Sequence, residues 1–167
     1  GGLMTMAGGD FDAVMPDESL DDWVEDLVYY FDGLCDPPLI EEILSHSYER
    51  MQDYQEHGCE FFKQEDGTLK SVPQRGLDHM RLYPAQLKGR GGELMARTLV
   101  KQLQEKGVTR MGRIMLTDYL MQDDRVVGAA GFDSISGDFI VIKAQAVIAA
   151  SGWGGWKTSY GKNTPTG

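Results

Sequence analysis

Residues 6–13 read MAGGDFDA, two adjacent glycines followed at once by an aspartate, and the chain opens on another glycine pair in GGLMTM. A glycine has no Cβ, so such a pair is typical of backbone that another group approaches closely. Two kinds of group remain open at this point. The backbone could be approached by another segment of the protein, or by the phosphates and sugar of a cofactor.

Two further segments place glycines beside a helix start or a strand end, where bare backbone N–H groups can hold an anion. Residues 88–93, KGRGGE, begin a predicted helix, and Lys88 and Arg90 add positive charge there. Residues 147–155, VIAASGWGG, form an apolar stretch that runs into glycines, as at the carboxyl ends of strands where open α/β sheets bind ligands. KGRGGE can equally be a simple helix cap.

The charge is divided unevenly over the 167 residues. Residues 1–66 hold 18 Asp and Glu against 2 Lys and Arg, whereas residues 67–167 hold 8 against 14. Such an acidic half would repel a nucleic-acid backbone, so we expect no nucleic-acid partner. No apolar run is long enough for a membrane span, and the presence of only Cys35 and Cys59 argues against a disulfide-built module. We therefore expect a cytoplasmic protein.

Periodicity predicts helices in the first two thirds of the chain and strands in the last. A first helix has Ser19 as its N-cap and Gly33 as its stop, and one long amphipathic helix runs from Asp36 and Pro37 to Gly58. Residues 59–72 read as strand, tight turn and strand, and residues 73–90 read as irregular. A third helix spans Gly91 to Gly107, and a meander of three strands is followed by an apolar fourth at 146–150.

Other catalytic patterns are missing. His46, His57 and His79 lack ligand spacing with the cysteines, so we expect no metal site. The serine-hydrolase elbow and the phosphate-loop pattern do not occur, and the dinucleotide fingerprint G-x-G-x-x-G is absent as well. No catalytic residue can be assigned within these 167 residues.

The order of the motifs resembles the flavoproteins of the fumarate reductase and succinate dehydrogenase family, in the branch of flavocytochrome c and ketosteroid dehydrogenases. GGLMTMAGGD is similar to that family's stretch ending in Ala-Gly-Gly, and CDPPLIEEILSHSYERMQDYQEHGCEF to its helix that begins with Asp-Pro. VIAASGWGG resembles the strand ending in Ala-Thr-Gly-Gly, and the final PTG the start of Thr-Gly-Asp-Gly.

The resemblance implies an α/β fold, seen here as an α+β slice of a Rossmann-like FAD-binding domain with an antiparallel meander and amphipathic helices. Residues 1–167 would be the middle of that domain. The first βαβ unit with G-x-G-x-x-G would lie upstream and a capping domain downstream. The residues that the resemblance implies for FAD binding are Thr5, Ala7, Gly8, Gly9, Asp10, Ala150, Ser151, Gly152, Thr166 and Gly167. Trp153 replaces the family's second glycine.

The activity implied is that of an FAD-dependent oxidoreductase, in which hydride passes between flavin N5 and a C=C or CH–CH bond of a small substrate. The implied partners are the rest of the flavoprotein, the substrate and an electron-transfer partner. Two alternatives stay open: a non-catalytic interaction or scaffold fragment without cofactor, and a nucleotide-binding module that uses KGRGGE. Without the pyrophosphate loop, we expect the isolated 167 residues to retain FAD poorly.

Overall fold

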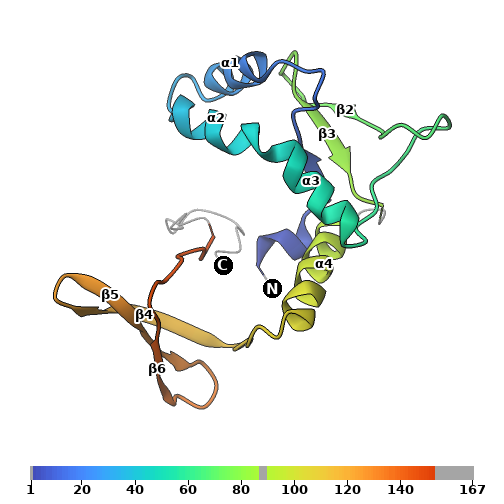
Figure 1. Cartoon of the computed structure of the whole chain (residues 1–167). Coiled ribbons are helices and arrows are strands. Elements are labelled where there is room, and N and C mark those ends of the chain that lie inside the picture. Colours follow the sequence, from blue (N-terminus) through green and yellow to red (C-terminus); the bar gives the residue numbers. More distant parts are fainter. Residues whose placement is uncertain (1, 87–89, 153–167) are drawn as a thin grey trace, which may run out of the picture. The chain divides into compact units, whose positions relative to one another are not determined.

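The computed structural model describes residues 2–86 and 90–152 (Figure 1). The predictions made for Lys88, Trp153, Thr166 and Gly167 lie outside these residues. The chain divides into two compact units between Lys106 and Gly107, and each unit is described by itself. Among the described helices, none combines the length and the apolar character that crossing a membrane requires.

The first unit combines helices with a small antiparallel sheet of order β1-β3-β2, in which Phe11 lies opposite Tyr83. One core cluster contains Met51, Phe61 and Met95, and a second gathers around Trp23. In chain order its elements are η1 (Leu3–Met6), β1 (Asp10–Asp12), α1 (Leu20–Tyr30), α2 (Pro37–Ser45), α3 (Ser47–Glu56), β2 (Val72–Pro73), β3 (Arg81–Pro84) and α4 (Gly91–Glu105).

Both predicted N-caps are confirmed. The Ser19 hydroxyl accepts a hydrogen bond from the N–H of Asp22 at 3.3 Å, and the Asp36 carboxylate accepts one from Leu39 at 3.3 Å. Each bond satisfies one of the N–H groups that a helix start leaves without a partner. Gly33 has φ 73°, the left-handed conformation in which glycine commonly follows a helix end.

The prediction of one long helix from Asp36 to Gly58 is wrong. The helix ends at Ser45 and a second one begins at Ser47. The Ser47 hydroxyl donates to the carbonyl of Leu44 at 2.6 Å and accepts from the N–H of Val14 at 3.0 Å. This buried bridge joins the break to a segment 33 residues earlier in the chain, a contact that helical periodicity alone could not reveal.

Residues 59–86 differ from the prediction in both directions. The turn at Asp66-Gly67 is present, with the Asp66 carboxylate accepting from the N–H of Thr68 at 2.9 Å, but the two predicted strands around it are wrong: among the described residues, their arms are joined by the isolated bridge between Lys63 and Leu69. The segment read as irregular contains β3, because Arg81–Pro84 pairs with both β1 and β2. Pro84 stands at the last position of β3, and a proline in the sequence disfavours a strand.

A buried carboxylate fixes the loop before β3. Asp26 on α1 is 9% exposed and accepts from the backbone N–H of His79 at 2.7 Å and of Met80 at 3.0 Å. Burial alone would raise the pKa of Asp26, but the hydrogen bonds from His79, Met80 and Asp78 outweigh it and lower the pKa. Asp26 therefore joins α1 to β3 as a charged acceptor.

The second unit confirms the three-stranded meander. It contains β4 (Ile114–Gln122), β5 (Arg125–Asp133) and β6 (Phe139–Lys143), paired antiparallel in the order β4-β5-β6. Asp123 and Asp124 in the first turn have φ of 48° and 60°, as a tight two-residue hairpin turn requires. The strands approach closely at Gly131, where a Cβ would lie 2.1 Å from the carbonyl oxygen of Met115.

The predicted fourth strand is not formed within the described residues. Residues 146–150 are without strand assignment, and Ile148 is 91% exposed. An apolar strand needs neighbours that take its backbone hydrogen bonds and cover its side chains, and the described part of the chain supplies none.

Candidate cofactor site

The opening glycines lie against the start of α4. The N–H of Gly91 donates to the carbonyl of Gly8 at 2.8 Å, and that of Gly92 donates to the carbonyl of Ala7 at 3.3 Å. On the other side, the N–H of Ala85 donates to the carbonyl of Gly9 at 2.9 Å. The carbonyl groups of residues 7–9 thus join the opening segment to α4 and to the end of β3.

Two of these glycines are required by the protein itself. Gly9 has φ 89°, and a Cβ on it would lie 2.1 Å from the carbonyl carbon of Gly91. A Cβ on Gly92 would lie 2.0 Å from the carbonyl oxygen of Met4. For Gly9 and Gly92, the closely approaching group is therefore another segment of the chain.

Gly8 is different from its neighbour. It is exposed, and a Cβ on it would meet only the Asp10 carboxylate, at 3.6 Å. Among the described residues, none accepts a hydrogen bond from the N–H of Gly8 or of Gly9, although Gly9 is buried. Buried N–H groups are nearly always paired. The strip Ala7–Gly9 therefore offers two unused donors on bare backbone.

The flanking candidates frame this strip. Thr5 is half-buried in η1, and its hydroxyl donates to the carbonyl of Gly2 at 2.9 Å. Asp10 is exposed at the first position of β1. The structure thus brings Thr5, Ala7, Gly8, Gly9 and Asp10 together on one short segment, with the Thr5 hydroxyl already engaged.

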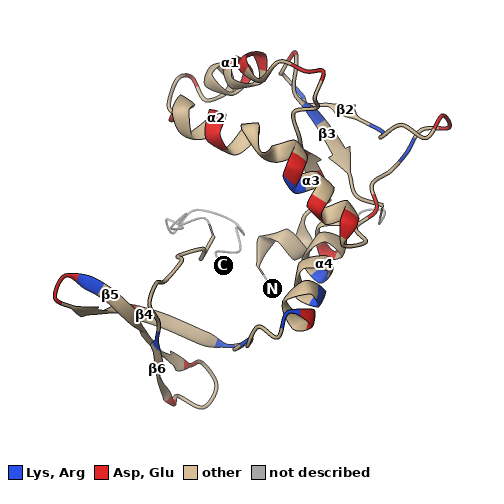
Figure 2. Ribbon diagram, in the orientation of Figure 1, with Lys and Arg blue, Asp and Glu red and all other residues tan. Residues whose placement is uncertain are grey.

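Gly91 and Gly92 of KGRGGE form the start of α4, which packs on the opening segment. The N–H groups of Gly91 and Gly92 are bonded to the opening segment, and Glu93 forms ion pairs with Arg90 and Arg97. Figure 2 shows basic and acidic residues along α4. A phosphate there would compete with these partners. This geometry agrees with the cap interpretation and disfavours the nucleotide-binding module that KGRGGE suggested.

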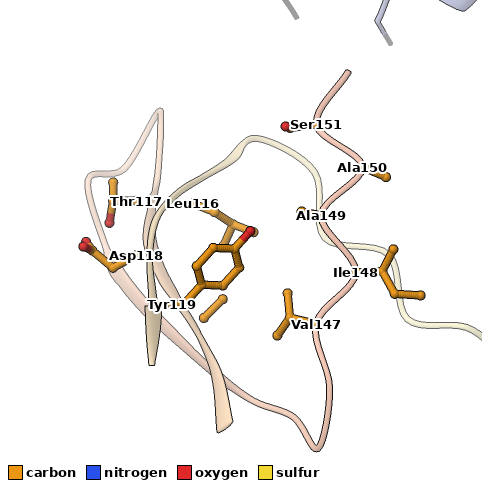
Figure 3. A pocket seen from close by; sticks show the side chains of 10 residues that line it. Leu116, Thr117, Asp118, Tyr119, Val147, Ile148, Ala149, Ala150 and Ser151 are labelled. Carbon is orange, nitrogen blue, oxygen red and sulfur yellow. The ribbon is translucent and has the colours of Figure 1, made fainter. Parts of the chain in front are cut away.

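The second group of candidates lies in the other unit, at a cavity of about 480 Å³ between β4 and residues 147–151 (Figure 3). Ala150 and Ser151 line it, and Gly152 follows with φ 86°. The Tyr119 ring lies between the strand and Val147 in the close view. A mostly apolar slot with a few polar groups is typical of small-molecule sites.

The meander supplies one wall of the slot, which was not predicted from the sequence. Its residues there are Leu116, Thr117, Asp118, Tyr119 and Ala129. The small residues of GAAG at 128–131 are the signal that could have marked β5, since small side chains in a strand often indicate a close approach by another group. Thr166 and Gly167 cannot be placed, because they lie outside the described residues.

Bare backbone with unused N–H donors and an apolar slot beside a glycine turn are subsites of the kind that nucleotide cofactors occupy. Residues 1–166 match the model of the FAD binding domain family, and the chain belongs to that family. The expected cofactor, FAD, is thereby confirmed for the domain.

The relatives agree with this assignment. The chain is 28% identical over 136 residues to the fumarate reductase flavoprotein subunit of Mycobacterium tuberculosis, covering 81% of this chain and 23% of that protein. It is 26% identical over 157 residues to the fumarate reductase flavoprotein subunit of Escherichia coli, covering 93% of this chain and 26% of that protein. The chain thus spans about a quarter of the length of these relatives.

Among solved structures, E. coli quinol fumarate reductase with the FrdA E245Q substitution matches with a TM-score of 0.77 at 25% identity, over 89% of this chain and 26% of that one. A flavocytochrome c3 fumarate reductase shares the fold, with a TM-score of 0.76 at 19% identity, over 89% of this chain and 26% of that one. The expected fold class, an α/β FAD-binding domain seen as a helix-and-meander slice, is confirmed.

Proposed function

We propose that residues 1–167 are the middle part of the FAD-binding domain of a fumarate reductase-type oxidoreductase. The dinucleotide loop and the capping domain would belong to the same flavoprotein. Support comes from the family match over residues 1–166 and from fumarate reductase relatives of which the chain covers about a quarter. The site assignment depends on the N–H groups of Gly8 and Gly9, which have no acceptor among the described residues.

In this proposal the strip Ala7–Gly9 receives the flavin and pyrophosphate side of FAD. The exposed Gly8 leaves room for the cofactor, its N–H and that of Gly9 donate to it, and Thr5 and Asp10 border it. Gly9 and Gly92 keep the strip in shape by their contact with α4 and η1. Thr166 and Gly167 would begin a further loop on the flavin side.

The adenosine half of FAD would occupy the slot beside Ala150, Ser151 and Gly152. Small side chains at 149 and 150 leave the slot open, and the exposed Tyr119 provides a ring face against which a base can stack. The Ser151 hydroxyl can donate to or accept from the sugar. These residues bind and orient the cofactor and take no part in proton transfer.

When bound, FAD would supply hydride exchange at N5 with a C=C or CH–CH bond of a small substrate. The substrate, the residues that hold it and an electron-transfer partner would belong to other parts of the assembly. We also propose a cytoplasmic location, which fits the free thiols of Cys35 and Cys59.

The strip is tested by Gly8→Val in the intact flavoprotein. The protein itself leaves this position open, so the variant should fold and melt like the parent, whereas the added side chain should occupy the cofactor's place. We expect flavin content, read from visible absorbance and from extracted FAD, to fall about tenfold or more. Gly112→Ala is the matched control, since a Cβ there meets nothing within 4 Å.

The result separates the alternatives. A Gly8→Val protein that keeps its full flavin content would remove the strip from the cofactor site. An intact parent protein without any flavin would favour the non-catalytic scaffold instead.

A further inference from the structure

The carboxylate of Asp10 lies beside the open face of Gly8. On β1, Phe11 packs edge-on against Tyr54 with the ring centroids 5.6 Å apart, so strand alternation directs Asp10 to the opposite side of the strand. Among the described residues, a Cβ built on Gly8 would meet only Oδ2 of Asp10, at 3.6 Å. A group that fills the open face of Gly8 therefore comes close to a carboxylate oxygen.

The backbone on both sides of this carboxylate is fixed. Asp10 lies opposite Pro84 in the antiparallel register of β1 and β3, and the N–H of Ala85 donates to the carbonyl of Gly9 at 2.9 Å. The strip Ala7–Gly9 and the backbone of Asp10 thus keep one relative position, because both are bonded to the same segment.

The charge of Asp10 acts on its surroundings. Asp12 follows on the same side of β1, and its pKa is raised first by partial burial and then by the Asp10 charge. Within residues 2–86 and 90–152, Asp10 forms no ion pair, and the arginines near the start of α4, Arg90 and Arg97, are both paired with Glu93. The side of β1 next to the strip is therefore negatively charged.

This charge determines which part of FAD can lie over Gly8. The diphosphate carries negative charge of its own and would be repelled by the carboxylate. The oxidised flavin ring is neutral and can lie there. Two electrons and one proton convert it to a reduced ring with one negative charge near neutral pH, and a neighbouring carboxylate opposes that change.

Given that the strip Ala7–Gly9 binds FAD as proposed, we propose that the Asp10 carboxylate lies at the edge of the flavin ring and lowers the reduction potential of the bound flavin. A lower potential makes the reduced flavin a stronger hydride donor. Asp10 thereby favours the reduction of a C=C bond over the oxidation of a CH–CH bond.

The test is Asp10→Asn in the intact flavoprotein, with the potential of the bound flavin measured by dithionite titration against a redox dye of known potential. We expect the equilibrium between oxidised and reduced flavin to shift about tenfold toward the reduced form, which is an increase of about 30 mV for a two-electron couple. Thermal melting and flavin content should match the parent, since the amide has nearly the same shape and the residue is exposed.

Two further variants separate charge from position. Asp10→Glu keeps the charge beside the strip, so its potential should lie closer to the parent's than that of Asp10→Asn. Glu65→Gln removes an equal charge at an exposed position of the turn before Gly67 and should leave the potential unchanged. A shift as large with Glu65→Gln as with Asp10→Asn would mean that the net charge of the protein acts and that Asp10 has no special place.

The variants at Gly8 and Asp10 fail in different ways. If Gly8→Val removes the flavin but Asp10→Asn leaves the potential unchanged or lowers it, the strip binds FAD and the role assigned to Asp10 is wrong. Tighter FAD binding by Asp10→Asn without a change in potential would place the diphosphate over Gly8 and also overturn that role. A parent protein without flavin, or a Gly8→Val protein that keeps it, would overturn both proposals.

Discussion

Gly92 lies in the first turn of α4 and faces the opening segment, where its N–H donates to the carbonyl of Ala7 at 3.3 Å. In an ordinary helix, alanine is more stable than glycine by about 1 kcal/mol. Here the added methyl would lie 2.0 Å from the carbonyl oxygen of Met4 and 2.9 Å from that of Ala7. Both are backbone atoms, which cannot move aside as a flexible side chain can.

We therefore expect Gly92→Ala to lower the free energy of unfolding by about 3 kcal/mol, against the direction of helix propensity. Urea denaturation followed by circular dichroism measures the change. Gly112→Ala, at an open position, should stay within about 0.5 kcal/mol of the parent. A Gly92→Ala chain as stable as the parent would mean that η1 does not pack on α4 as described.

Asp26 gives the first unit a pH-dependent contribution to stability. Its folded pKa is lowered, so the stabilisation is complete above the unfolded value of about 4 and is lost as the pH falls through the folded pKa. Asp26→Asn should lower the free energy of unfolding at pH 7 by about 2 kcal/mol, because an amide is a weaker acceptor for three N–H donors.

The difference between Asp26→Asn and the parent should shrink when the same urea titrations are repeated below pH 4. Glu25→Gln, at the exposed neighbouring position, should leave the stability nearly unchanged. A constant difference at all pH values would show that the variant acts through packing and that the Asp26 charge contributes nothing.

At the scale of elements, the sequence predicted what short-range chemistry determines. Ser19, Asp36 and Gly33 act on backbone groups within a few residues, so both caps and the helix end could be read directly. The break between α2 and α3 depends on Val14, and β3 exists because two other strands pair with it. Those contacts join residues far apart in the chain, which no local pattern specifies.

The candidate site was likewise predicted only in part from the sequence. The glycine pair at 8–9 predicted a close approach, but only the structure separates Gly9, which faces α4, from Gly8, where an added Cβ would meet only the Asp10 carboxylate at 3.6 Å. Ala150 and Ser151 were expected from the resemblance, whereas the meander wall opposite them was not. A strand's own residues do not indicate which other segment will lie across from them.

At the scale of the whole molecule, the two candidate subsites belong to different compact units, divided between Lys106 and Gly107. Each unit offers only part of what a dinucleotide needs: two N–H donors on the strip Ala7–Gly9, and an open apolar slot beside Ala150. In our proposal the loop that holds the pyrophosphate lies outside these residues. The largest favourable contact with the cofactor's charge would then be absent from the chain.

We therefore expect the 167-residue chain alone to bind FAD with a Kd on the order of 0.1–1 mM, corresponding to only about 4–5.5 kcal/mol. AMP should bind within about tenfold of FAD, because both carry the adenosine half that the slot accepts, and FMN, which lacks that half, should bind more weakly. Calorimetric titration of the three ligands measures this order, and Tyr119→Ala should weaken AMP and FAD together by removing the ring face. Submicromolar FAD binding by the chain would contradict the placement of the pyrophosphate loop elsewhere, and AMP binding that Tyr119→Ala leaves unchanged would contradict the adenosine slot.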